Sequence, residues 1–185
     1  MKLTYALLAA ALATSLPAQA DKAMAKEAKG VMKEFGGALL SEVQKSMKAV
    51  GPVGTIAMCN VKAPMIAKQV SDDKGWDVSR TSLKYRNPGN KPEAWELKVL
   101  NDFEARKASG EEVKPMAFME TVTENGKKTF RFVKAIPTGK VCLNCHGVEV
   151  APGVEAKLKE LYPNDKARGY KAGDIRGAFV LKKTY

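Results

Sequence analysis

Two of the three cysteines and the only histidine of this chain lie within five residues, in the sequence Cys142-Leu143-Asn144-Cys145-His146. This spacing is compatible with covalently attached haem, with bound zinc and with a redox dithiol. A match by chance is a fourth interpretation. Each kind of site requires a different arrangement of the remaining chain, which therefore decides among them.

The N-terminus has the features of a secretory signal peptide. Lys2 precedes an apolar run from Tyr5 to Leu16, and Ala18-Gln19-Ala20 matches the small-residue pattern of a cleavage site. The apolar run is shorter than a bilayer-spanning helix, although an uncleaved N-terminal anchor is the alternative. We predict a signal peptide at residues 1–20 and a mature chain that is periplasmic or otherwise exported and has no transmembrane segment.

The mature chain, residues 21–185, has a length that suits one domain with a single core. The formal net charge of the whole chain is +11 at pH 7. An exported chain without a run of basic residues or a recognisable nucleic-acid-binding motif is expected to meet acidic proteins or anionic surfaces, and no nucleic acid. The charge therefore favours an acidic redox partner protein.

The order and chemistry of the motif favour haem. Adjacent residues such as Cys145 and His146 can hardly face one tetrahedral zinc centre, and no parallel strand follows the motif as in a redox dithiol domain. In a haem site the two thiols add to the two vinyl groups on one edge, and the next imidazole lies under the iron. We predict one covalently bound haem c, with Cys142 and Cys145 as thioether anchors and His146 as proximal ligand.

The sixth position of the iron cannot be filled by another histidine of this chain, because there is none. Methionine, the spare Cys59, lysine, tyrosine, water or an open position remain. Cys59 has no other evident occupation, but a buried inert thiol is its alternative interpretation. The rival methionines, which more often fill cores than bind metal, are Met58, Met65, Met116 and Met119.

Hydrophobic periodicity and turn signals predict an α+β fold. We expect a helix over residues 21–50 with a bend at Gly36-Gly37, and a second helix from residue 51 with a break or kink near Pro64, so that the helical part covers about residues 21–70. An antiparallel sheet with inserted helices follows: strands over 76–84 and 173–185, two strands within 113–136 about Asn125-Gly126, and helices over 93–107 and 152–163.

Four segments carry a resemblance to a known family: GPVGTIAMCNVKAP, GWDVSRTSLKYRNPGNKPEAWE, CLNCHG and LYPNDKARGYKAGDIRGA. In this order they resemble the exported single-haem c-type family with a PAS-like domain and an unusual His/Cys axial pair. The resemblance implies a PAS-like domain with one covalently attached haem. It places the proximal histidine on His146, the thioether cysteines on Cys142 and Cys145, and the distal cysteine ligand on Cys59.

The matched segment around residue 86 also offers candidate contacts for the two haem propionates. Arg80, Arg86 and Asn87 are expected near one turn, and guanidinium groups bind carboxylates in forked geometry. The alternative is that both arginines lie on a solvated strand face.

Two classes of function follow from these expectations. In the first, the protein is a redox or gas sensor, in which the thiolate leaves on reduction and admits CO or NO; the signal then needs a separate partner, because the chain carries no kinase or cyclase module. The alternative is a periplasmic single-electron carrier steered to its partners by the basic surface. An enzyme is the weaker third class, since no catalytic constellation is evident apart from the expected iron.

Overall fold

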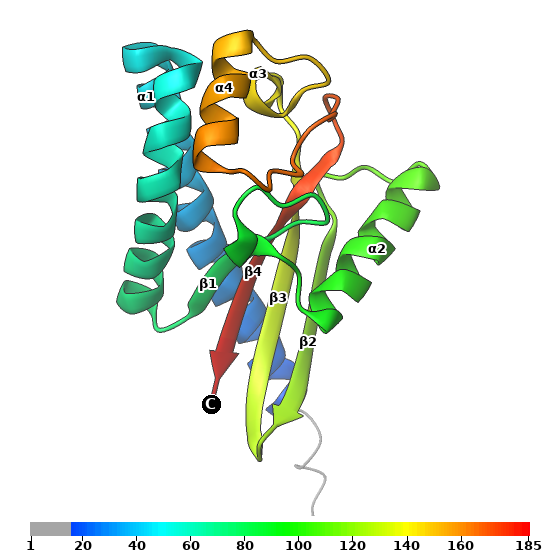
Figure 1. Cartoon of the computed structure of the whole chain (residues 1–185). Coiled ribbons are helices and arrows are strands. Elements are labelled where there is room, and N and C mark those ends of the chain that lie inside the picture. Colours follow the sequence, from blue (N-terminus) through cyan, green and yellow to red (C-terminus); the bar gives the residue numbers. More distant parts are fainter. Residues whose placement is uncertain (1–15) are drawn as a thin grey trace, which may run out of the picture.

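Four antiparallel strands form the sheet of this protein, and helices cover both of its faces (Figure 1). The computed structural model describes residues 16–185, so most of the predicted signal peptide lies outside the described residues. The strand order is β1-β4-β3-β2. In chain order the elements are α1 (Leu16–Lys74), β1 (Asp77–Thr81), the 3-10 turn η1 (Pro88–Asn90), α2 (Ala94–Ala108), β2 (Ala117–Glu124), β3 (Lys127–Pro137), the 3-10 turn η2 (Lys140–Cys142), α3 (Leu143–His146), α4 (Pro152–Leu161) and β4 (Ile175–Thr184).

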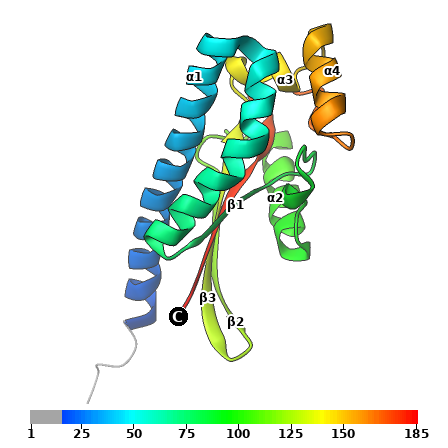
Figure 2. The same cartoon turned by 60° about the vertical axis from the view of Figure 1, so that its left-hand side comes forward.

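The long helix α1 folds back on itself, and its two arms lie side by side (Figure 2). The reversal is at Gly51, where φ is 65° and ψ is −173°. Only glycine adopts this region readily, because a Cβ atom would clash with the backbone. Pro52 then stands in the first turn of the second arm, where its missing N–H costs no helical bond. The predicted division into two helices after residue 50 is confirmed.

The helix is not broken near Pro64, because helical dihedral angles continue through that residue, as they do through Gly36-Gly37. Ala63, Ile66 and Val70, which flank Pro64, pack into the main core and keep the second arm in register. Gly36 serves a different purpose: a Cβ atom there would lie 3.0 Å from Cζ of Phe179 in β4. The small residue lets helix and sheet approach closely.

Replacing Gly51 with alanine is expected to destabilise the protein by about 1–3 kcal/mol, because alanine is strained at these dihedral angles. Gly37→Ala is the matched control, since Gly37 is an exposed residue within the same helix and an added Cβ would meet no atom within 4 Å. That control is expected to stabilise by about 0.5–1 kcal/mol. Urea unfolding measures both; equal effects of the two substitutions would contradict a special role of Gly51.

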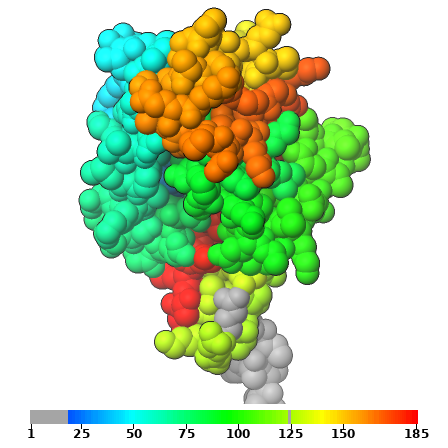
Figure 3. All heavy atoms as spheres, in the orientation of Figure 1, coloured from blue at the N-terminus to red at the C-terminus, as the bar shows by residue number. Residues whose placement is uncertain are grey.

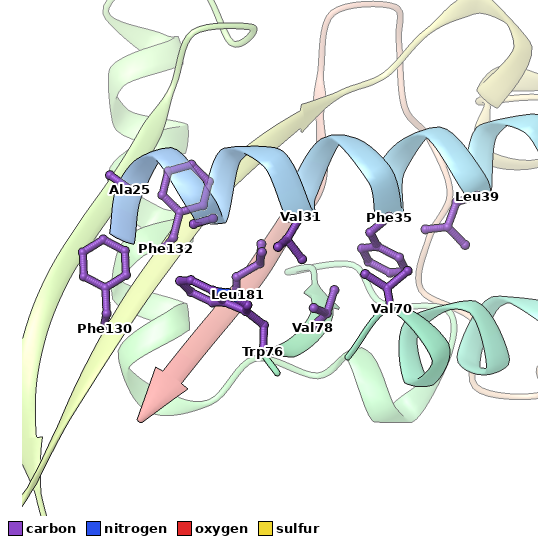
Figure 4. Packing of buried hydrophobic residues seen from close by; sticks show 11 residues of the cluster. Ala25, Val31, Phe35, Leu39, Val70, Trp76, Val78, Phe130, Phe132 and Leu181 are labelled. Atoms are coloured by element: carbon purple, nitrogen blue, oxygen red, sulfur yellow. The ribbon is translucent and has the colours of Figure 1, made fainter. Parts of the chain in front are cut away.

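The two faces of the sheet bury two separate cores. On one face, residues from both arms of α1 pack against Phe130, Phe132 and Leu181 (Figure 4). On the other face, Leu100 and Phe103 of α2 pack with Val133, Val180 and their neighbours. Strand residues alternate between the cores because successive side chains point to opposite faces. This two-sided burial explains the nearly continuous apolar runs of β3 and β4.

The hairpin β2–β3 projects at the end of the molecule opposite to α4 (Figure 3). Asn125 and Gly126 at its turn have φ angles of 52° and 75°, as expected for a type I′ turn. The strand predicted over 76–84 is shorter, because the Ser82 hydroxyl donates to the carbonyl of Lys84 or Arg176 and turns the chain after Thr81. Within residues 16–185, no helix has the length and apolar composition that crossing a membrane requires.

Candidate functional site

A cavity of about 280 Å³ lies between α1, the ends of β1 and β4, and the segment that contains the cysteine-histidine motif. All seven residues that the resemblance and the haem chemistry assigned to a haem site line this cavity: Cys59, Arg80, Arg86, Asn87, Cys142, Cys145 and His146. These residues come from segments that are separated by up to about half the length of the chain. The fold therefore gathers into one place the residues that the sequence analysis connected only by chemistry and resemblance.

The local structure of the motif brings its two cysteine side chains and its histidine side chain together. The motif follows β3 directly and forms the end of η2 and the single turn α3. Residues three and four apart lie on one side of such a turn, so Cys142, Cys145 and His146 share the side that faces the cavity. Gly147 closes the turn, and its N–H donates to the carbonyl of Leu143.

The imidazole of His146 is held in its neutral form. Its Nδ1 lies 2.9 Å from the carbonyl oxygen of Ala167, and since a carbonyl can only accept, Nδ1 carries the proton. Burial lowers the pKa of His146 well below its ordinary value, and the positive charges of Arg176 and Arg86 act in the same direction. Nε2 is left with its lone pair, the form of histidine that binds metal.

Cys59 projects from the second arm of α1 into the same cavity. Burial raises the pKa of its thiol, although the charges of Arg80 and Arg86 lower it in part. Burial likewise raises the pKa of the Cys145 thiol, against the charges of Arg86 and Arg168. All three cysteines are free thiols in this structure.

The methionines weighed as rivals of Cys59 lie elsewhere. Met116 is buried in the core under α2, and Met65 and Met119 are exposed. Met58 is not among the residues that line the cavity, but Met47 of the first arm is. Sequence reasoning missed Met47, because its helical spacing indicated only core packing.

Three arginines line the cavity, and its lining contains no aspartate or glutamate. The side chain of Arg80 has no hydrogen-bond or ion-pair partner among residues 16–185. Arg176 donates only to the Ser82 hydroxyl, at 3.2 Å, and to the Lys84 carbonyl, at 3.4 Å. Burial lowers the pKa of both guanidinium groups. Half-buried cations without an anionic partner favour an anionic ligand.

Arg86 differs from the other two arginines because it already has an acidic partner. Its Nη2 lies 3.1 Å from Oδ2 of Asp165, and both side chains are nearly buried. The same nitrogen donates to the carbonyl of Cys145 at 2.5 Å. Its Nε is buried and has no hydrogen-bond partner among the residues described. Arg86 therefore lines the cavity, and the hydrogen bonds and the ion pair that it makes with the described residues all go through Nη2.

Arg176 was not singled out in the sequence, although it stands in a segment that carries the family resemblance. A strand position beside Gly177 gave no sign that its side chain enters the cavity. The remaining lining is largely apolar, with Leu39, Val43, Ile56, Ile136 and Phe179 among its residues. Apolar walls with two unpaired cations suit a flat apolar ligand that carries carboxylates.

Two comparisons with known proteins found a match. The model of the Tll0287-like family, Tll0287, matches residues 17–183. A search of curated proteins found no match. The crystal structure of the cyanobacterial haem protein Tll0287 is similar, with a TM-score of 0.61 and 25% sequence identity, over 89% of this chain and 94% of the other.

The structural likeness confirms the PAS-like α+β fold that was predicted, with helices on both faces of an antiparallel sheet. The family match spans nearly all of the described residues and confirms the resemblance drawn from the four sequence segments. The chain belongs to the Tll0287-like family.

Proposed function

We propose that this protein is an exported haem protein that carries one haem c and acts as a redox or gas sensor. Cys142 and Cys145 would form the thioether bonds, and His146 and Cys59 would be the axial ligands. The observation that carries the proposal is the convergence of these four side chains in one cavity. The relationship to a cyanobacterial haem protein supports haem as the ligand.

The residues present fit the group. An apolar macrocycle matches the apolar lining, and two propionates match the two arginines that lack acidic partners, Arg80 and Arg176. The orphaned Nε of Arg86 offers one further donor, and Asn87 lies in the same lining. Arg80, Arg86 and Asn87 thus stay candidates for the propionates, and the structure adds Arg176.

When bound, the haem supplies a one-electron couple and a coordination position that a diatomic gas can take. The protein's own groups determine how that position is controlled. His146 is fixed through Nδ1, so it remains in place. Burial raises the pKa of Cys59, so a free Cys59 sulfur would hold a proton at neutral pH. A ligand that is protonated on leaving favours a sensor over a carrier.

A single-electron carrier is the second candidate, and the charge near the cavity favours it. Lys166 stacks over the ring of Tyr85, which lines the cavity, and Lys84 stacks over Tyr170. Neither lysine has a carboxylate partner within residues 16–185. These exposed charges would steer an acidic redox partner to this end of the molecule. A carrier keeps both axial ligands in both redox states, whereas a sensor loses one on reduction.

The experiment that tests the proposal is expression of the full chain in a bacterium that attaches haem to exported proteins. We expect the periplasmic protein to begin after Ala20 and to exceed the mass of the chain by one haem, with a c-type pyridine haemochrome spectrum. The double variant Cys142→Ser, Cys145→Ser is the control and should lack the covalent haem. Wild-type protein without covalent haem would overturn the proposal. CO binding to the reduced protein then separates sensor from carrier.

A further inference from the structure

The segment from Asp165 to Tyr170 runs beside the motif and is tied to it at several points. The N–H of Tyr170 donates to the carbonyl of His146, and the N–H of Gly169 donates to that of Gly147, each at 3.0 Å. The carbonyl of Ala167 accepts the Nδ1 proton of His146. The position of the imidazole therefore depends on what fixes Ala167.

Two charged side chains contact the backbone of Ala167: Asp165 at its N–H and Arg86 at its carbonyl. Oδ1 of Asp165 accepts from the N–H of Ala167 at 2.9 Å, and Oδ2 pairs with Arg86 at 3.1 Å. Nη2 of Arg86 lies 3.4 Å from the Ala167 carbonyl and 2.5 Å from the Cys145 carbonyl. Arg86 thus connects two backbone segments. One is the motif, at Cys145, and the other contains Ala167, whose carbonyl accepts the imidazole proton.

The ion pair between Arg86 and Asp165 is nearly buried, and further contacts hold it in place. The side chain of Asp165 is 6% exposed and that of Arg86 is 12% exposed. Arg168 donates to Oδ2 of Asp165 at 2.9 Å and also pairs with Glu155 of α4, which anchors the carboxylate from the outside. The planar guanidinium holds Nη2 where it reaches the Asp165 carboxylate and two backbone carbonyls, a geometry that the ammonium of lysine on its flexible stem does not reproduce.

We propose that Arg86 and Asp165 are positioning residues for His146, which hold the Ala167 carbonyl against Nδ1 and so set the reduction potential of the haem. This inference rests on the proposed function. A carbonyl that accepts the Nδ1 proton makes the imidazole a stronger donor and fixes its orientation. The stronger donor favours ferric iron and lowers the potential. Arg86, expected from the sequence at a propionate, acts in this view mainly through the proximal histidine.

The test is the midpoint potential of Arg86→Lys and Arg86→Gln, with Arg106→Lys and Arg106→Gln as matched controls. Arg106 of α2 makes a more exposed ion pair with Glu111, and neither residue lines the cavity. Arg86→Lys keeps the positive charge, so a purely electrostatic role of Arg86 predicts no change in the midpoint potential. Arg86→Gln removes a positive charge, so that role predicts a lower potential. A positioning role predicts a higher potential in both variants.

We expect a rise that corresponds to about tenfold in the electron-transfer equilibrium, about 59 mV for one electron. We also expect a broadened ferric EPR signal. The Arg106 variants should match the wild type. An unchanged potential in Arg86→Lys, or a fall in Arg86→Gln, would overturn the positioning role; if one variant does not fold, the other still decides.

A second readout uses the single histidine of the chain. Its imidazole gives one unambiguous set of NMR signals, which report whether Nδ1 carries the proton. In the haem-free chain, where Nε2 is not bound, we expect the Nδ1–H form with Arg86 present and a mixture of tautomers in Arg86→Lys; identical spectra would contradict the inference. If the wild type carries no haem, the proposed function fails, yet this spectrum of the haem-free chain still decides whether Arg86 acts on His146.

Discussion

Cys59→Ala is expected to abolish a thiolate-type low-spin EPR signal of the ferric protein and to raise the midpoint potential. An anionic sulfur ligand stabilises ferric iron, so its loss shifts the redox equilibrium toward ferrous iron by about 100-fold or more, about 120 mV for one electron. The covalent haem should remain, because Cys142 and Cys145 are untouched. EPR, redox titration and intact mass on wild type and variant measure these three effects.

Met47 provides the sharpest control for this prediction, since it is a methionine that lines the same cavity. Met47→Leu alone should leave the ferric signal and the potential unchanged. In the double variant Cys59→Ala, Met47→Leu, the loss of the signal should equal that of Cys59→Ala. An unchanged low-spin signal in Cys59→Ala would mean that Met47 or another group holds the sixth position, and the assignment of Cys59 would be wrong.

Asp165→Asn is expected to destabilise the haem-loaded protein by about 3–5 kcal/mol at pH 7, because it leaves the nearly buried Arg86 without its anionic partner. Urea unfolding followed by circular dichroism measures the free energy of unfolding. Asp102→Asn is the matched control: Asp102 is 59% exposed and pairs with Arg106 at 3.5 Å. An exposed pair of this kind contributes at most about 1 kcal/mol. Equal losses in both variants would contradict a special role for the buried pair.

The effect of Asp165→Asn should also depend on pH in a defined direction. Burial alone would raise the pKa of Asp165, but hydrogen bonds from Arg86, Arg168 and the Ala167 N–H outweigh it and bring the pKa below the ordinary value of 3.8. A carboxyl with a lowered pKa in the folded state adds stability above its unfolded pKa and loses it as the pH falls further. The difference between wild type and variant should be constant near neutrality and shrink below pH 3.8. A difference that grows on acidification would contradict the assigned ion pair.

Much of the secondary structure is local and could be read from the chain. The turn at Asn125-Gly126 requires two positive φ angles, which these residues adopt at low cost, and the structure has them at 52° and 75°. The helix over 93–107 was predicted within one residue of each end of α2. The effects of Gly36 and Pro64 could not be read in this way, because their neighbours in space decide them: the helix is not broken at Pro64. Packing against Phe179 and against the first arm of α1 was invisible in the local pattern.

In the candidate site, too, some features follow from the sequence alone and others depend on the fold. The sequence determined the motif, because the spacing of Cys142, Cys145 and His146 is a property of five consecutive residues. Only the tertiary structure decided that Arg176 enters the cavity and that Arg86 pairs with Asp165, 79 positions away. Which charges meet depends on strand register and on how α1 folds back at Gly51, and long-range contacts of this kind leave no periodicity in the chain. The sequence therefore specified the reactive groups, and the fold assigned their partners.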